Sequence, residues 1–170
     1  MVVSSRRQVE VYRARPIVLG VTVFLSLLLQ AVLPLSFPRA RFFDFPLLVV
    51  IYFALLRRSK IFGIGLGTAV GLLQDALAHH YLGLYGMAKA LAGYLAASAS
   101  VKFDLEQFLA RFILAGILVL VHGAFLLGTE RALLEFPPPF VPLDLAASVL
   151  FNIAIAPFLF HFLDRFKRTV

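Results

Sequence analysis

The sequence predicts an all-helical integral membrane protein with six transmembrane helices and both termini in the cytoplasm. Of its 170 residues, 61% are hydrophobic and 15% are charged, whereas soluble domains average about 45–50% and about 25%. Its apolar runs approach or reach the roughly 17–25 residues that a helix needs to cross about 30 Å of hydrocarbon. Most Lys and Arg residues flank these runs instead of interrupting them.

The six predicted spans form a single membrane domain over residues 1–170, and they cover residues 17–36, 42–56, 61–78, 84–101, 112–128 and 145–163. Helices are expected because unpaired backbone groups in lipid cost several kcal/mol, and the runs lack the alternation of barrel strands. The first span follows Pro16, which suits a first helical turn. It is longer than the apolar part of a signal peptide, which is about 7–15 residues.

The second span is short, but its ends are well marked. Asp44 can cap the helix start, Pro46 fits the first turn, and Arg57 and Arg58 can reach water from the far end. The third and fourth spans are rich in small residues and are joined by a short link, which predicts a helical hairpin. The fifth run is uninterrupted. The sixth contains Pro157, which is expected to kink it.

The distribution of positive charge gives the orientation. With an even number of spans, twelve Lys and Arg residues lie on the side of the termini, three lie on the opposite side, and Lys89 lies inside a span. This asymmetry favours cytoplasmic termini. Because the charges form no single basic stripe, nucleic acid is not expected as a partner. The absence of Cys excludes disulfides and thiolate metal sites.

Two charged residues lie well inside predicted spans, Asp75 in the third and Lys89 in the fourth. Intramembrane charges usually pair, face a cavity or mark a pathway. Counted from the hairpin tip, both lie at similar depth on antiparallel helices, so a structural ion pair between them is the favoured interpretation. A ligand or ion site, and independent contact of each side chain with water, remain as alternatives.

Small residues on the same helices would let the two backbones approach closely. Gly63, Gly67 and Gly71 recur every fourth residue towards Asp75, and Gly93 and Ala97 continue a similar stripe from Lys89. These five small residues are therefore predicted to be helix-packing positions.

The remaining polar residues indicate neither catalysis nor a metal site. His79 and His80 are adjacent in a loop with no carboxylate nearby in sequence, and His122 and His161 are expected to be packed side chains and not proton relays. Asn152 is expected to donate a hydrogen bond between helices. Because the sequence contains no Ser/His/Asp set and no HExxH, P-loop or GxSxG motif, we expect no enzyme activity and no cofactor.

The outer loop between the last two spans contains a stiff apolar segment, made of Phe136, Pro137, Pro138, Pro139 and Phe140. Consecutive prolines favour an extended conformation that can meet a partner at low entropic cost. Closure of the loop over the protein's own helices is the favoured interpretation, and contact with a partner is the alternative.

The region from about residue 45 to 95 resembles the MreD family of rod shape-determining proteins. It reads FPLLVVIYFALLRR, then GIGLGTAVGLLQDAL, then LGLYGMAKALAGYL. The most specific blocks are GLLQDAL at residues 71–77 and LGLYGMAK at residues 82–89. The other spans match only as hydrophobic helices.

The resemblance implies a noncatalytic component of the complex that builds the lateral cell wall, located in the bacterial inner membrane. It implies a single-span MreC-like partner and, through it, MreB, RodA and the transpeptidase partner of RodA. It also implies a fold similar to the substrate-binding subunits of energy-coupling-factor transporters, so a vitamin-type transport subunit is the alternative function. Transport ranks second because the sequence shows few polar residues at outer depth and no Ala-xxx-Ala pattern in the first span.

Overall fold

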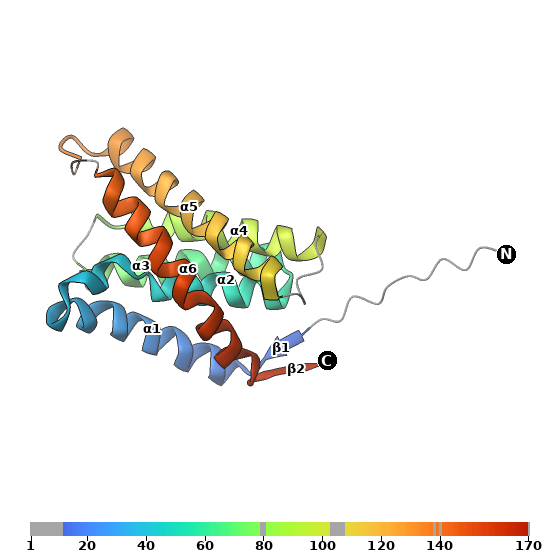
Figure 1. The fold of residues 1–170 in the computed structure, drawn as a ribbon. Helices are drawn as coiled ribbons and strands as arrows, with labels where there is room; N and C mark the ends of the chain where they lie inside the picture. Colours follow the sequence, from blue (N-terminus) through green and yellow to red (C-terminus); the bar gives the residue numbers. More distant parts are fainter. Residues whose placement is uncertain (1–11, 79–80, 103–107, 138, 140, 170) are drawn as a thin grey trace.

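The computed structural model describes residues 12–78, 81–102, 108–137, 139 and 141–169. In this part of the chain six α-helices form one bundle, as the sequence predicts (Figure 1). The helices are α1 (Pro16–Ser36), α2 (Phe45–Arg57), α3 (Lys60–Ala78), α4 (Leu84–Lys102), α5 (Phe108–Leu133) and α6 (Pro142–Asp164). The 3-10 helix η1 (Pro38–Phe42) joins α1 to α2, and two short strands, β1 (Tyr12–Ala14) and β2 (Lys167–Thr169), flank the bundle.

Four of these helices are long and apolar enough to cross a membrane, namely Pro16–Ser36, Lys60–Ala78, Ala110–Leu133 and Pro142–Asp164. The other two have different characters. Helix α2 has 13 residues, and its residues from Pro46 to Leu55 are all buried, so the surrounding helices shield it from lipid. Helix α4 has 19 residues and contributes buried alanines to the core. Six crossings therefore remain a prediction, whereas four helices of membrane-spanning character are established.

The two strands hold the ends of the described chain together. They pair antiparallel, with Tyr12 opposite Thr169 and Arg13 opposite Arg168. The start of α1 and the end of α6 consequently lie at the same end of the bundle (Figure 1), here named the ribbon end. A chain whose ends lie on the same side of a membrane crosses it an even number of times.

The start of α2 has the predicted cap. The Asp44 carboxylate accepts a hydrogen bond from the backbone N–H of Leu47 at 3.0 Å, and Pro46 lies in the first turn. Helix α2 ends at Arg57, followed by Arg58 in the left-handed conformation with φ of 53°. Asp44 lies at the end of the bundle opposite the strands, here named the far end.

Helices α3 and α4 pack with their backbones in direct contact. A Cβ atom at Gly67 would lie 2.5 Å from the carbonyl carbon of Lys89, and one at Gly71 would lie 2.6 Å from the Cα of Gly86. Gly63 and Gly93 face each other in the same way. Only glycine permits this approach, because any side chain would force the helices apart. Ala97, further along α4, is fully buried in the core.

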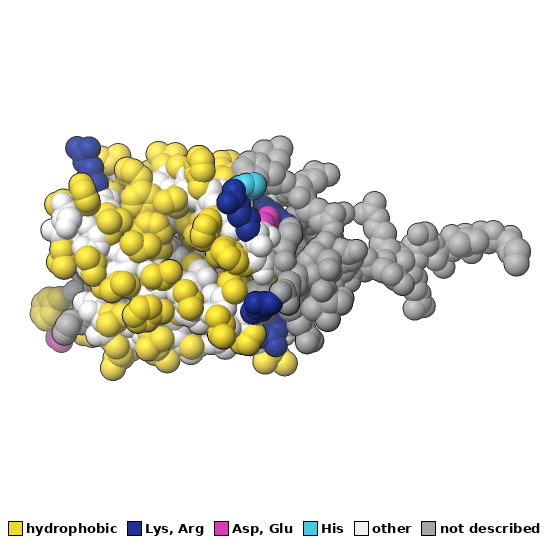
Figure 2. All heavy atoms as spheres, turned by 90° about the horizontal axis from the view of Figure 1, so that it is seen from below, with side chains coloured by type: hydrophobic (Ala, Val, Ile, Leu, Met, Phe, Trp, Pro, Cys, Tyr) yellow, Lys and Arg dark blue, Asp and Glu magenta, His cyan; other side chains and the backbone are white. Residues whose placement is uncertain are grey.

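The outside of the bundle is apolar. Figure 2 shows a face covered mainly by hydrophobic side chains, with the coloured Lys and Arg side chains near its two ends. The most exposed large apolar side chains include Ile17, Leu35, Ile61, Phe136 and Phe158. A surface of this kind suits contact with lipid tails and not with water.

Candidate functional site: a polar cluster and cavity at the far end

A buried ion pair lies at the centre of the far end. The Lys89 ammonium Nζ lies 2.6 Å from Asp44 Oδ2, and Lys89 is fully buried. Asp44 comes from the start of α2 and Lys89 from α4, so the pair joins two helices. Taking these charges out of water is costly, and the cost is offset only by close geometry and further hydrogen bonds. Both conditions hold here, because the carboxylate also accepts from Leu47 N–H.

The expected pair between Asp75 and Lys89 is not what the structure shows. Asp75 is fully buried, and it accepts hydrogen bonds from the backbone N–H groups of Gly83 at 2.8 Å, Tyr85 at 3.2 Å and Gly86 at 3.3 Å. It therefore caps the start of α4 from the neighbouring helix, in the manner of an N-cap residue. Lys89 lies further along α4 and extends its side chain to α2.

Asp75 and Lys89 do not pair because each has another partner. Depth along a hairpin places Asp75 and Lys89 near each other, but the first turn of α4 offers unpaired N–H groups that are closer to Asp75. The partner of Lys89 comes from α2, which hairpin geometry alone does not place. Both buried carboxylates thereby find donors.

Two amide side chains extend the cluster to α1 and α6. Asn152 of α6 accepts from the Asp44 backbone N–H at 2.8 Å and donates to the Phe42 carbonyl at 2.9 Å, which is the interhelical hydrogen bond the sequence predicts. Gln30 of α1 donates to the Phe43 carbonyl at 3.0 Å and accepts from the backbone N–H of Phe45 at 3.2 Å. The turn between η1 and α2 is thus held from both sides.

Helix α5 contributes His122, whose Nε2 lies 4.0 Å from Asp44 Oδ2. The ring is buried and lies 6.1 Å from the Tyr85 ring. It is packed as expected, but in the described part of the chain its Nε2 has no hydrogen-bond partner. His161, by contrast, is exposed. The histidines at positions 79 and 80 lie outside the described residues.

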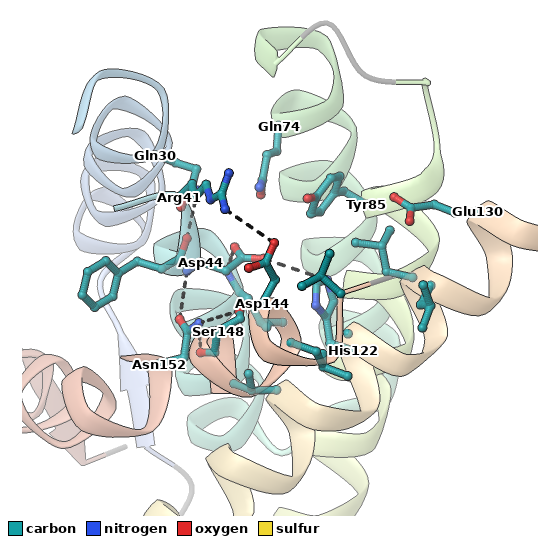
Figure 3. A pocket seen from close by; sticks show the side chains of 18 of the residues that line it. Gln30, Arg41, Asp44, Gln74, Tyr85, His122, Glu130, Asp144, Ser148 and Asn152 are labelled. Carbon is teal, nitrogen blue, oxygen red and sulfur yellow. Dashed lines mark hydrogen bonds and ion pairs between the residues drawn. The ribbon is translucent and has the colours of Figure 1, made fainter. Parts of the chain in front are cut away.

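A cavity of about 360 Å³ adjoins Asp44 of the ion pair, and Figure 3 shows the side chains that line it. Its polar lining residues are Gln30, Arg41, Asp44, Gln74, Tyr85, His122, Glu130, Asp144, Ser148 and Asn152. Gln74 points into the cavity from α3 (Figure 3), and its Oε1 is buried without a hydrogen-bond partner among the described residues. The sequence did not predict this gathering of polar residues at one end of the bundle.

The cavity escaped sequence analysis because its polar residues are spread along the chain, with one to three of them from each contributing helix. Asp44, Lys89, His122 and Asn152 are each more than 25 positions apart in the chain, so no local motif joins them. A usable signal did exist. Gln30, Gln74 and His122 are polar residues in otherwise apolar runs, and such residues usually face the interior of a bundle.

The loop between α5 and α6 approaches this cavity. Pro139 and Val141 line it, whereas Phe136 is 85% exposed and Pro137 is also exposed. The structure therefore combines closure over the protein's own helices with an exposed aromatic side chain. Pro138 and Phe140, which complete the predicted contact segment, lie outside the described residues.

The arrangement can fix helices in position and can receive a polar group in the cavity. Within the described residues no group of three or more His, Cys, Asp and Glu side chains is placed to hold a metal ion. At the ribbon end a second ion pair, Arg111 Nη1 to Asp164 Oδ2 at 2.8 Å, joins α5 to α6. Tyr52 of α2 donates to the same carboxylate at 3.1 Å.

Comparison with known families gives a direct result. A family model described as rod shape-determining protein MreD matches residues 13–166, which is nearly the whole chain. The chain belongs to the MreD family. The resemblance on residues 45–95 is thus confirmed, and it extends over all six helices. Among curated proteins and among solved structures nothing matches the chain.

Membership of the MreD family establishes a role in rod shape determination. Together with the four membrane-length apolar helices, it makes the chain a multi-pass protein of the bacterial inner membrane. The polar cluster and the cavity at the far end are then features of an MreD-family bundle.

Proposed function

We propose that this MreD-family chain is a noncatalytic membrane scaffold of the cell-wall elongation complex, crossing the membrane six times with both termini in the cytoplasm. The single observation that carries the proposal is the family match over residues 13–166. The paired strands support an even number of crossings, and the charge asymmetry supports the orientation.

The interior of the bundle supports a scaffolding role. In the described part of the chain, buried charged side chains hold helices together. Lys89 pairs with Asp44 between α4 and α2, and Asp75 caps α4 from α3. Glycines lock α3 against α4. A bundle tied at both ends offers fixed outer surfaces, which a partner can bind with little loss of conformational entropy.

The proposed direct partner is a single-span protein of the MreC type, which would connect the chain indirectly to MreB, RodA and the transpeptidase partner of RodA. A single transmembrane helix would lie against an apolar helix face. Its outer portion would meet the loop segment 136–140, where Phe136 is exposed. Exposed aromatic residues are frequent anchors of protein interfaces.

Co-purification with the MreC-like protein of the same bacterium tests the proposal. Phe136→Ala should reduce the recovered partner several-fold, because truncating an anchor aromatic weakens binding by about 1–3 kcal/mol. Phe158→Ala is the matched control, since Phe158 is also highly exposed but lies within α6. Equal recovery with both variants would contradict the loop contact. Failure of the unmodified chain to recover the partner would contradict direct binding.

The cavity at the far end favours a second candidate, a substrate-binding subunit of a small-solute transporter. Such a subunit needs a polar pocket near the outer face, and the cavity supplies polar and aromatic lining residues. Purification from native membranes distinguishes the two candidates. A co-purifying ATPase module with a bound soluble solute would favour transport, whereas recovery of the single-span partner alone favours the scaffold.

A further inference from the structure

The polar cavity adjoins a second cavity of about 340 Å³ between α1 and α3. The two cavities share four lining residues, namely Gln30, Arg41, Gln74 and Tyr85. The remaining lining of the second cavity is apolar and consists of Leu27, Ala31, Pro34, Leu77 and Ala78. Because Ala31 and Leu77 are exposed on the outside of the bundle, this apolar cavity joins the lipid-facing surface to the polar cavity.

Two buried polar atoms in the lining of the polar cavity lack partners. Gln74 Oε1 and His122 Nε2 have no hydrogen-bond partner among the described residues, and the two residues are only 6% and 5% exposed. Asp44 Oδ2, at 4.0 Å from His122 Nε2, is too far away for a hydrogen bond. Gln74 is aimed into the space between Arg41 and Tyr85 (Figure 3). Buried polar atoms without partners are rare in folded proteins and indicate a bound group or water.

The charged side chains that line the polar cavity already interact within the protein. Asp44 pairs with Lys89 at 2.6 Å. Arg41 and Asp144 offset each other at 3.5 Å, and Glu130 also has an interaction within the chain. An ion that entered the cavity would therefore have to take a counter-charge from one of these interactions, and an unpaired charge out of water is costly. Among the described lining residues, the charges thus favour an uncharged ligand.

Hydroxyl groups suit the two unpartnered atoms. A hydroxyl can both donate and accept a hydrogen bond. It can therefore donate to Gln74 Oε1, and it can bond to His122 Nε2 whether or not that nitrogen carries a proton. Because the two atoms come from different helices, α3 and α5, a ligand that bonds to both needs more than one hydroxyl. A sugar ring presents several hydroxyls and carries no charge.

We propose that the two cavities together bind one lipid with an uncharged sugar head group. The sugar lies in the polar cavity, where its hydroxyls bond to Gln74 Oε1 and His122 Nε2. An acyl chain lies in the apolar cavity between α1 and α3. The apolar lining and its opening towards lipid favour a lipid over a free sugar. This lipid site goes beyond the scaffold function and does not depend on partner binding.

The test uses the full-length protein reconstituted in nanodiscs that contain equal amounts of monogalactosyl diacylglycerol, phosphatidylethanolamine and phosphatidylglycerol. After detergent extraction and washing, the lipid retained per protein is measured by mass spectrometry. The expected result is retention of the galactolipid well above the other two lipids, because both phospholipids carry a charged phosphate. A parallel arm with soluble methyl galactoside distinguishes a free sugar from a lipid, and its binding should be much weaker because it has no acyl chain.

Gln74→Leu tests the head group. It removes the amide but keeps a side chain of similar size, so galactolipid retention should fall about fivefold, the factor that the loss of one hydrogen bond between uncharged groups implies. Thr68→Val is the control on the same helix, because the Thr68 hydroxyl bonds only to its own helix at 2.9 Å in the described structure.

Ala31→Phe tests the acyl chain. The larger side chain would occupy the apolar cavity that Ala31 lines, so galactolipid retention should fall several-fold. Val32→Phe is the control, because Val32 is the next residue of α1, is 50% exposed and lies outside the described lining of both cavities. Retention by this control should match that of the unmodified chain.

Equal retention of the three lipids, preferential retention of a phospholipid, or no retained lipid would overturn the proposal. Binding of methyl galactoside as tight as that of the galactolipid would overturn it as well. Loss of retention in Gln74→Leu and Ala31→Phe, but in neither control, would support it when the four variants are equally stable to heating in detergent. If Gln74→Leu alone is less stable, the Ala31→Phe and Val32→Phe pair decides, and equal retention by these two would overturn the proposal.

Discussion

Replacing Lys89 with Met would leave the Asp44 carboxylate buried without its counter-ion. The two charged atoms lie 2.6 Å apart, and Lys89 is fully buried while Asp44 is nearly so. Removing one member of such a pair typically costs about 3–5 kcal/mol, because the remaining charge stays desolvated. Among the described residues, the Leu47 N–H at 3.0 Å would then be the one backbone donor to the carboxylate, so we expect the cost of Lys89→Met to fall in this range.

The double variant Asp44→Asn with Lys89→Met separates the interaction free energy of the ion pair from the effect of each single substitution. Asn preserves the N-cap of α2, and replacing a buried pair by uncharged groups is often nearly neutral. The double variant should therefore be more stable than Lys89→Met alone, with a coupling free energy of about 2 kcal/mol or more. The matched cycle uses Asp75→Asn with Lys89→Met, for which the coupling should be clearly smaller, because Asp75 bonds to backbone N–H groups and acts on Lys89 only through space.

Reversible unfolding in mixed micelles with increasing SDS, followed by far-UV circular dichroism, provides the free energies. A coupling within 0.5 kcal/mol of zero for Asp44 and Lys89, together with a large coupling for Asp75 and Lys89, would refute the assignment of the ion pair. It would restore the pairing that hairpin depth alone predicts.

Three further predictions concern helix packing, capping and topology. Gly67→Ala should destabilise the bundle by more than about 1 kcal/mol, measured by the same unfolding, because its Cβ would meet the α4 backbone; Gly65→Ala, with open space around it, should not. Asp75→Ala should cost about 1–2 kcal/mol by loss of the α4 cap, and Asp75→Asn should recover most of it, so equal loss in both would contradict capping. The chain has no Cys, so the double variant Arg13→Cys with Arg168→Cys should form a disulfide within one chain when the purified protein is oxidised, as judged by gel mobility. Disulfide-linked dimers alone would contradict the strand pairing.

The features that depend on local pattern could be predicted from the sequence. The all-helical class follows from apolar length, the cap at Asp44 follows from its place before Pro46, and the small-residue stripes at Gly67 and Gly93 lie where α3 meets α4. Each of these needs only one helix or one hairpin. Local spacing therefore carries enough information to specify them.

Features that need three or more helices could not be predicted in this way. Lys89 binds Asp44, which is 45 positions away, because α2 passes through the middle of the bundle. The sequence predicted a second span over residues 42–56 but did not indicate which faces meet lipid, and in the structure residues Pro46 to Leu55 are all buried. The cavity likewise assembles from side chains on α1 and on α3 to α6, together with η1 and the start of α2. Hydropathy shows that a segment avoids water, but it does not show whether the segment contacts lipid or the interior of the protein.

We propose that this chain holds the shape-determining complex together in the membrane. Depletion of the chain in its own rod-shaped bacterium, with cell width measured by microscopy and the MreC-like partner tracked by co-purification with RodA, tests it most directly. We expect rounded cells and loss of the partner from RodA complexes. Cells that stay rod-shaped with the complex intact after full depletion would contradict it.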